Sequence, residues 1–334
     1  MRRREFLIVS AMLASGTQRA FAQQVGPKKR LALVHPSTKT ADMRMSGADD
    51  GFTIYLRELE RLGYVEGINL IIERYSAEGQ PERYGDLARE VVGAHPDLIA
   101  VSGTALAARF KAATSTIPIS ALTGDPIRFG LVSSLAHPGG NITGVSFDAG
   151  TELWGKRLEI LAEVAPRLRR AAFVGPRAAL DGAGGKATRE AAARLGIDLV
   201  DASVATPVNE QAYRNTFETI GRDPPDGLVF TADFESYPLR QFLVELVKQS
   251  GLPAIFTLRE QAAVGGLMSY AADLKSPLRA SAGQAAEILR GGNPAEMPYI
   301  QATRFELVIN LKTAKALGLT VPPTLLARAD EVIE

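Results

Sequence analysis

The turn formed by Ser102, Gly103 and Thr104 has the residue types of a small-anion site. It follows the apolar run 97–101 and precedes the stretch 105–113, which has the composition of a helix. Glycine lets the backbone come close to a ligand, and the free N–H groups at a helix start attract a carboxylate. The alternative is that Ser102 or Thr104 only caps its own helix.

A second turn of similar composition contains Thr123, Gly124, Asp125 and Pro126 and follows the apolar run 117–122. Aspartate is a favoured N-cap residue, and proline suits the first position of a helix. The pattern therefore predicts that a helix begins at Pro126. Two helix N-termini at neighbouring strand ends would attract an anion more strongly than one. Thr123, Gly124 and Asp125 are therefore candidate ligand contacts.

Polar side chains after other apolar runs are further candidate contacts. His35 and Ser37 follow the first run, where His35 would either hydrogen-bond a ligand or be a satisfied loop histidine. Asp233 could hold an amino group and Tyr237 could stack on a ring, but Asp233 could equally cap the next helix. Arg177 could reach an acidic ligand, although exposed arginines commonly bind nothing.

The sequence lacks the residue sets of the common catalytic and metal sites. The three histidines, His35, His95 and His137, are not at metal-ligand spacing. The glycine-rich segment 181–188 resembles a phosphate-binding loop but lacks its first glycine and the Ser or Thr after the lysine. Neither a G-x-S-x-G nor an H-E-x-x-H motif is present. We therefore expect no catalytic residue, no metal and no cofactor.

The elements that must position these residues alternate between apolar strands and amphipathic helices. In the helix predicted at 49–62, leucines recur on one face and Gly63 follows at the C-terminal end. Strands are predicted at 30–35, 69–74, 97–101, 117–122 and 142–147, and in a second series at 170–174, 197–202, 227–231 and 254–256. This alternation predicts parallel sheets with helices on both faces. The two series predict two similar doubly wound α/β lobes joined by a hinge.

The last part of the chain is predicted to cross between the lobes again. A strand at 267–270 and a helix at 277–289 are assigned to the first lobe, and 305–310 to a further crossing. The predicted first lobe is therefore 28–147 plus 268–298. The predicted second lobe is 148–267 plus 299–334.

The N-terminal segment 1–22 has the pattern of a cleaved export signal. Three arginines are followed by a short apolar stretch, and the segment closes on Ala20, Phe21 and Ala22. The apolar stretch is too short to span a bilayer. The run from Arg3 to Leu7 also resembles the twin-arginine motif of bacteria. An ordinary signal that happens to be rich in arginine is the alternative.

Charge and cysteine content restrict the possible partners of the mature chain. Cleavage after Ala22 removes four arginines and one glutamate and leaves a net charge of −2. This balance disfavours nucleic-acid and membrane-surface partners. The chain has no cysteine, so it has neither disulfides nor a cysteine for a lipid anchor. We expect a soluble periplasmic protein that is a monomer.

The mature chain contains several stretches that are specific enough to compare with known families, at 57–67, 111–118, 124–132, 138–144, 265–270 and the tail 305–333. They resemble the tryptophan/tyrosine-type substrate-binding protein family of ABC transporters, and the resemblance covers essentially the whole mature chain. The family has the type I periplasmic-binding fold, with two α/β lobes, a ligand cleft and three crossings. The resemblance therefore implies the same architecture that the pattern of strands and helices predicts.

The resemblance also implies roles for individual residues. Ser102, Gly103, Thr104 and Thr123 would hold the carboxylate of a ligand. Asp233 would hold its amino group, and Ser269 and Tyr270 would line the hinge.

The implied function is a receptor that delivers an amino acid or aromatic acid to an ABC-transporter permease in the inner membrane. Aromatic-amino-acid members carry an amide-containing Thr-Asp-Asn run where this chain has Ala232, Asp233 and Phe234. A periplasmic sensor that presents its solute to a signalling receptor is the alternative. An exported hydrolase would need a nucleophile, base or metal set that the sequence lacks.

Overall fold

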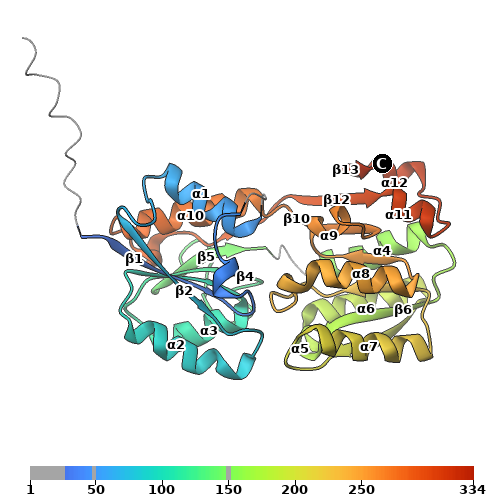
Figure 1. The fold of residues 1–334 in the computed structure, drawn as a ribbon, viewed down its shortest axis with the longest axis horizontal. Helices are drawn as coiled ribbons and strands as arrows, with labels where there is room; N and C mark the ends of the chain where they lie inside the picture. The colour runs from blue at the N-terminus through green and yellow to red at the C-terminus, as the bar shows by residue number, and fades with distance from the viewer. Residues whose placement is uncertain (1–26, 47–49, 148–151) are drawn as a thin grey trace, which may run out of the picture.

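Two lobes, each built on a β-sheet, make up the computed structural model of the protein (Figure 1). The structure describes residues 27–46, 50–147 and 152–334, so the predicted export signal lies outside the described residues. In Figure 1 the lobes lie side by side, with the C-terminus on the second. None of the helices in the described ranges combines the length and hydropathy needed to cross a bilayer.

The first lobe contains a parallel sheet that has six strands in the described part of the chain. In spatial order they are β11 (Ile300–Gln301), β5 (Ile142–Ser146), β4 (Ile119–Thr123), β3 (Leu98–Ser102), β1 (Lys29–His35) and β2 (Leu70–Ser76). The helices of this lobe are α1 (Gly51–Arg61), α2 (Tyr84–Gly93), α3 (Thr104–Ala113) and α10 (Lys275–Leu289). Figure 1 shows α1 and α10 along one side of this lobe and α2 and α3 along the other.

The alternation of side chains along β1 explains why helices cover both faces of this sheet. Leu31 and Leu33 pack in the same cluster as the buried residues of α1 and α10. Ala32 and Val34 point the other way and pack with α2 and α3. A strand buried on both faces reads as a continuous apolar run, which is the sequence pattern at this position.

The second lobe contains a sheet that has seven strands among the described residues. In spatial order they are β13 (Glu331–Ile333), β12 (Phe305–Asn310), β10 (Met268–Ala272), β9 (Ala254–Phe256), β8 (Gly227–Phe230), β6 (Arg170–Pro176) and β7 (Asp198–Val204). Its longer helices are α4 (Glu152–Val164), α6 (Ala183–Leu195), α7 (Glu210–Arg222) and α8 (Arg240–Ser250). Shorter ones are α5 (Arg177–Asp181), α9 (Arg259–Ala263), α11 (Leu311–Ala316) and α12 (Pro323–Leu326). Neighbouring strands pair in parallel except β10 and β12, which pair antiparallel, so β12 and β13 run opposite to the other five described strands.

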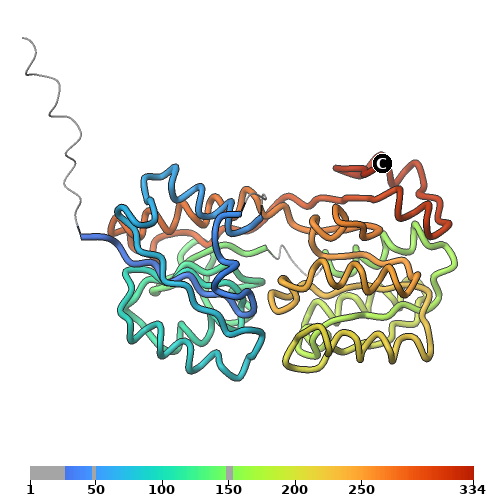
Figure 2. The backbone as a smooth tube through the Cα atoms, viewed as in Figure 1, coloured from blue at the N-terminus to red at the C-terminus, as the bar shows by residue number. Residues whose placement is uncertain are grey.

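The crossings between the lobes differ from the predicted boundaries. Strand β10 pairs with β9 and β12 in the second sheet, whereas 268–272 was assigned to the first lobe. Strand β11 pairs with β5 in the first sheet, whereas 299–301 was assigned to the second lobe. The chain therefore returns to the first lobe after Ala272 and leaves it after Gln301, as the orange segments of Figure 2 show.

Candidate ligand-binding site

A cavity of about 180 Å³ lies between the lobes and is lined by both. The first lobe contributes strand ends and the start of α1, including His35, Phe52, Tyr55, Ser102 and Ser120. The second lobe contributes Trp154, Arg157, Asp233, Phe234 and Tyr237. Most of this surface is apolar or aromatic, with a few polar groups among it, as is common in small-molecule sites.

The strand register shows that the cavity extends into the first lobe beneath α1 and α10. Ser102 pairs with Leu122 at the carboxyl edge of the sheet, and both line the cavity. One row deeper on the same face, Ala100 pairs with Leu33 on one side and with Ser120 on the other, and these three also line it. Ala100 and Ser120 in this deeper row have small side chains, which leave space under the two helices.

His35 lies at the boundary between the lobes as a buried neutral imidazole. Its Nδ1 accepts hydrogen bonds from the backbone N–H groups of Ser37 (3.2 Å) and Thr38 (3.0 Å). Its ring centroid is 5.6 Å from that of Phe52 and 6.0 Å from that of Phe234, which belong to different lobes. Burial lowers the pKa of His35 to about 3. Because Nδ1 accepts, the proton of the neutral ring is on Nε2.

Acidification should destabilise the protein partly through His35. The unfolded chain gains a proton on this residue below pH 6.5, whereas the folded chain stays neutral until about pH 3, so stability falls as the pH drops through this window. Between pH 7.5 and pH 5, wild type should lose about 2 kcal/mol more unfolding free energy than His35→Asn, measured in urea. Parallel pH profiles for the two proteins would contradict this.

The loop after β8 holds Asp233 by hydrogen bonds from its own neighbours. The carboxylate accepts from the backbone N–H of Ser236 (2.8 Å), the Ser236 hydroxyl (2.6 Å) and the Thr231 hydroxyl (2.9 Å). Burial, with a smaller contribution from the charge of Glu235, raises the pKa of Asp233 to about 6. These contacts fix the turn that precedes the 3-10 helix Tyr237–Leu239, whose N-cap residue is Ser236, so the prediction that Asp233 caps the next helix is wrong. Asp233 also lines the cavity.

Direct contacts join the lobes beside the cavity. The Ser37 hydroxyl donates to the carbonyl of Phe234 at 2.7 Å, and the Tyr84 hydroxyl donates to the Glu235 carboxylate at 2.7 Å. Phe147, at the end of β5, meets Phe234 edge to face with ring centroids 5.2 Å apart. Since each contact joins a first-lobe residue to a second-lobe residue, these contacts exist only when the lobes are close together.

The arrangement of two sheets around a cavity can be compared with known proteins. A family model described as ABC transporter substrate binding protein matches residues 43–333 of the chain. The chain belongs to this family. Its members bind small molecules and work with membrane permeases, outside the cytoplasm.

Individual relatives of this substrate-binding protein agree with the family assignment. The tyrosine-binding protein of Clostridioides difficile strain R20291 is 25% identical over 284 residues, which cover 79% of this chain and 75% of that protein. A solved domain from Vibrio cholerae superimposes with a TM-score of 0.78 at 25% identity, covering 91% of this chain and 99% of that one. An ABC domain from Streptococcus pneumonia in complex with L-Trp superimposes with a TM-score of 0.76 at 22% identity, covering 92% of this chain and 100% of that one. The sheets and such neighbours establish the type I periplasmic binding fold.

Only part of the first predicted turn faces the cavity of this substrate-binding protein. Ser102 lines the cavity, but Gly103 and Thr104 are not among the described residues that do. Gly103 is the N-cap of α3 with a φ of +95°, and no side chain within the described ranges caps this helix. The Thr104 hydroxyl instead accepts from the backbone N–H of Gly124 at 2.9 Å. The prediction that Ser102 or Thr104 caps α3 is therefore wrong.

The second predicted turn is turned away from the cavity. The buried Thr123 hydroxyl shares a hydrogen bond with the Tyr299 hydroxyl at 2.7 Å, inside the first lobe. Asp125 accepts from the backbone N–H groups of Ile127 (3.0 Å) and Arg128 (3.1 Å). Residues 126–130 form turns, so the predicted helix start at Pro126 is wrong. Proline and aspartate suit the start of a turn as well as that of a helix.

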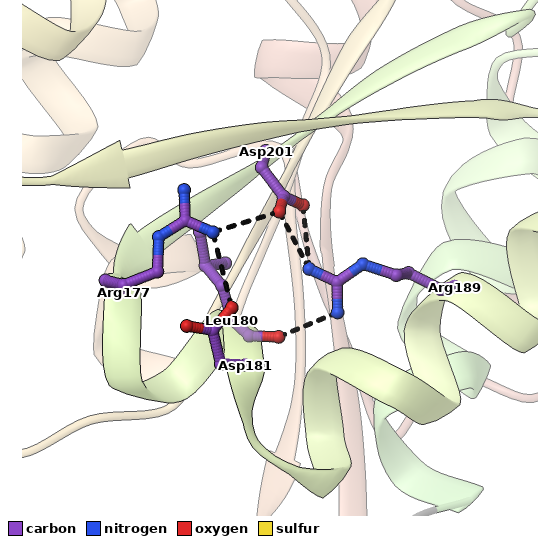
Figure 3. Close-up of polar contacts among 5 residues, drawn as sticks. All are labelled: Arg177, Leu180, Asp181, Arg189 and Asp201. Carbon is purple, nitrogen blue, oxygen red and sulfur yellow. Dashed lines mark hydrogen bonds and ion pairs between the residues drawn. The ribbon is translucent and has the colours of Figure 1, made fainter.

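Arg177 lies outside the cavity, in an ion-pair cluster on the second lobe (Figure 3). Its guanidinium is 3.3 Å from Asp181 and 3.2 Å from Asp201, and Arg189 approaches Asp201 to 2.8 Å. Arg189 also donates to the carbonyl of Leu180. The prediction that Arg177 reaches an acidic ligand is not supported by this placement, because its charge is compensated within the lobe.

The two predicted hinge residues lie in β10 and do not line the cavity. Ser269 is fully buried, and its hydroxyl has no hydrogen-bond partner among the described residues. The carbonyl of Tyr270 accepts from Nε of Arg157 at 2.8 Å. Tyr270 therefore positions a cavity residue through its backbone, while its ring packs against the core of the second lobe.

Trp154 packs against the core of the second lobe and also lines the cavity. Its ring covers Gly184 so closely that a Cβ there would lie 2.3 Å from it. A Cβ on Gly185 would lie 1.7 Å from the carbonyl of Leu180. The glycines of segment 181–188 are thus required for close helix packing.

Sequence reasoning also missed Tyr55, Ser120 and Arg157, which line the cavity from the interior of regular elements. Ser120 is a polar residue inside the apolar strand 119–123, and it was the one sequence feature that could have indicated a cavity at these three residues. Among the residues the structure describes, no cluster of His, Asp or Glu could hold a metal ion.

Proposed function

We propose that this protein is a non-catalytic receptor that captures a small carboxylate ligand between its lobes and delivers it to an ABC importer. The ligand class is an amino acid or an aromatic acid. The observation that carries the proposal is the cavity with apolar and aromatic walls from both lobes. A ligand that touches both walls stabilises the closed form, and a permease can recognise that form.

The charges around the cavity support a zwitterionic ligand. The described lining includes three basic and four acidic residues: Arg157, Arg259, Lys275, Asp233, Glu260, Asp273 and Glu306. Both ends of an amino acid can therefore find an opposite charge between the lobes. Arg157 is only 2% exposed and is held by the carbonyl of Tyr270, so its position is fixed before a ligand arrives.

The N-terminus of α3 supports a place for the carboxylate. The helix lacks a capping side chain in the described part of the chain, and Ser102, directly before Gly103, faces the cavity. Backbone N–H groups at such a terminus stabilise a negative charge. Asp233, carried over from the resemblance as the partner of an amino group, lies on the opposite wall. A relative named as tyrosine-binding is consistent with a ligand of this size and charge.

We further propose that the protein acts as a single copy in the periplasm after removal of 1–22. The twin-arginine route stays a prediction from the sequence, as does the absence of a lipid anchor.

A ligand panel followed by calorimetry and by fluorescence would test this function. Trp154 is the sole tryptophan of the chain and lines the cavity, so all tryptophan emission reports on the site. Amino acids and aromatic acids should bind with an emission change. Tyrosinamide, which lacks the carboxylate, should bind about 10- to 100-fold more weakly than tyrosine, as expected for the loss of a charged hydrogen bond. A panel without any binding, or equal binding of the amide, would overturn the proposal.

A further inference from the structure

The inner end of the cavity, which we call the inner pocket, lies inside the first lobe between its sheet and helices α1 and α10. Its described lining residues are Leu33, Tyr55, Ala100, Ser120, Leu278 and Ser281. None of the six carries a charge. The charged residues that line the cavity lie outside these six: most belong to the second lobe, and Asp273 and Lys275 lie where the chain enters α10.

Two hydroxyl groups of the inner pocket are buried and have no hydrogen-bond partner in the described part of the chain. Tyr55 is 6% exposed and Ser120 is 2% exposed. Neither hydroxyl oxygen has a hydrogen-bond partner within the described residues. Leaving a buried hydroxyl unpaired is unfavourable, and native proteins contain few such groups. Because both residues line one cavity, a bound group could satisfy both.

The chemistry of the pair restricts what that group can be. Burial raises the pKa of the Tyr55 phenol, so it stays protonated and can donate, and each hydroxyl can also accept. A charged group would be unfavourable here, since no opposite charge lines the inner pocket. A purely apolar group would leave both hydroxyls unpaired. An uncharged group that both donates and accepts fits this surface.

We propose that the inner pocket recognises an uncharged hydroxyl at the apolar end of the ligand, such as a phenol. The charged end of the ligand then lies between the lobes. This orientation rests on the proposed function, whereas the preference for a hydroxyl does not. Ligands that differ only by this hydroxyl are therefore distinguished by Tyr55 and Ser120.

The experiment compares pairs of probes on the full chain, with and without a carboxylate. Tyrosine against phenylalanine, and 3-(4-hydroxyphenyl)propionate against 3-phenylpropionate, are measured by calorimetry. The neutral pair p-cresol and toluene is measured by ligand-observed NMR, since binding of such small probes is weak. In at least one pair the hydroxylated member should bind about 10- to 100-fold more tightly, because its partner leaves buried hydroxyls unpaired.

Variants assign the preference to the inner pocket. Ser120→Ala and Tyr55→Phe should each weaken the hydroxylated probe about tenfold or more and leave the other member nearly unchanged. Tyr64→Phe is the matched control, because Tyr64 packs against the same hydrophobic cluster but does not line the cavity. The melting temperature of unliganded Ser120→Ala should be no lower than that of wild type, because the variant loses an unpaired buried hydroxyl. This melting temperature separates a role in binding from a structural role.

The outcomes separate this inference from the proposed function. Equal binding of both members in every pair, or no binding of any hydroxylated probe, would overturn the inner-pocket proposal. A preference for p-cresol over toluene without binding of any carboxylate would support the inner pocket and contradict the proposed function. A preference that both variants retain would show that the hydroxyl is recognised elsewhere, and it would also overturn the inference.

Discussion

Replacing Gly144 with alanine should prevent the first lobe from folding. Gly144 lies in β5 opposite Ala121 of β4, and a Cβ there would be 1.9 Å from the carbonyl oxygen of Ala121 and 2.7 Å from its carbonyl carbon. The obstructing atoms are backbone atoms of a paired strand, so they cannot move aside without breaking the ladder. We expect a loss of more than about 4 kcal/mol, seen as insoluble protein or a collapsed urea midpoint.

Gly140→Ala is the matched control for this experiment. It lies in the turn that leads into β5, and apart from its chain neighbours no described residue has an atom within 4 Å of the position of its Cβ. Its unfolding free energy should stay within about 0.5 kcal/mol of wild type. If Gly144→Ala unfolded at the same urea concentration as Gly140→Ala, then β4 and β5 could not be packed as described.

The two-lobe architecture was predictable from the sequence because buried parallel strands leave a strong pattern. The apolar run 30–35 corresponds to β1 at Lys29–His35, and the helix predicted at 49–62 is α1 at Gly51–Arg61. These elements are buried on defined faces, so apolar residues recur at the spacing of the element itself. Gly63, predicted at the end of α1, has the positive φ of +94° that such a position favours.

The crossings between the lobes were not predictable in this way. Strand β10 is a short apolar run that would suit either sheet. Its place is decided by pairing with β9 and β12, and nothing local to 268–272 encodes those partners. Similarly, β11 is only two residues long, too short to leave a periodic signal.

The candidate site was predictable only at the strand ends. His35, Ser102, Asp233 and Tyr237 were chosen because they follow strands, and all four line the cavity. Thr123 follows a strand as well, but its side chain points into the lobe towards Tyr299, and a side chain's direction depends on contacts that are distant in sequence. Tyr55 was missed because, within an amphipathic helix, a cavity tyrosine and a core tyrosine look alike.

Removing the two hydrogen bonds between the lobes should shift the protein towards an open conformation. In the double variant Ser37→Ala/Tyr84→Phe, the carbonyl of Phe234 and the carboxylate of Glu235 lose their donors from the first lobe. A hydrogen bond to a charged acceptor contributes about 1.5–3 kcal/mol and a neutral one about 0.5–1.5 kcal/mol. Together they would change the closing equilibrium by roughly 30- to 2000-fold.

Small-angle scattering and stopped-flow fluorescence of Trp154 would measure this shift. The radius of gyration of the unliganded double variant should exceed that of wild type, and its ligand should dissociate about tenfold faster or more. Tyr75→Phe is the control, because Tyr75 is a half-buried tyrosine that packs on the same core cluster as Tyr84. An unchanged radius together with an unchanged dissociation rate would show that these bonds do not hold the lobes together.

The association rate should respond much less than the dissociation rate. Ser37 and Tyr84 lie in the first lobe and bond to residues of the second, so neither hydrogen bond exists while the lobes are apart. A ligand that enters an open cleft meets the same surface in wild type and variant, whereas leaving the closed cleft requires both bonds to break in wild type alone. A decrease in the association rate as large as the increase in the dissociation rate would instead mean that the two residues shape the open site.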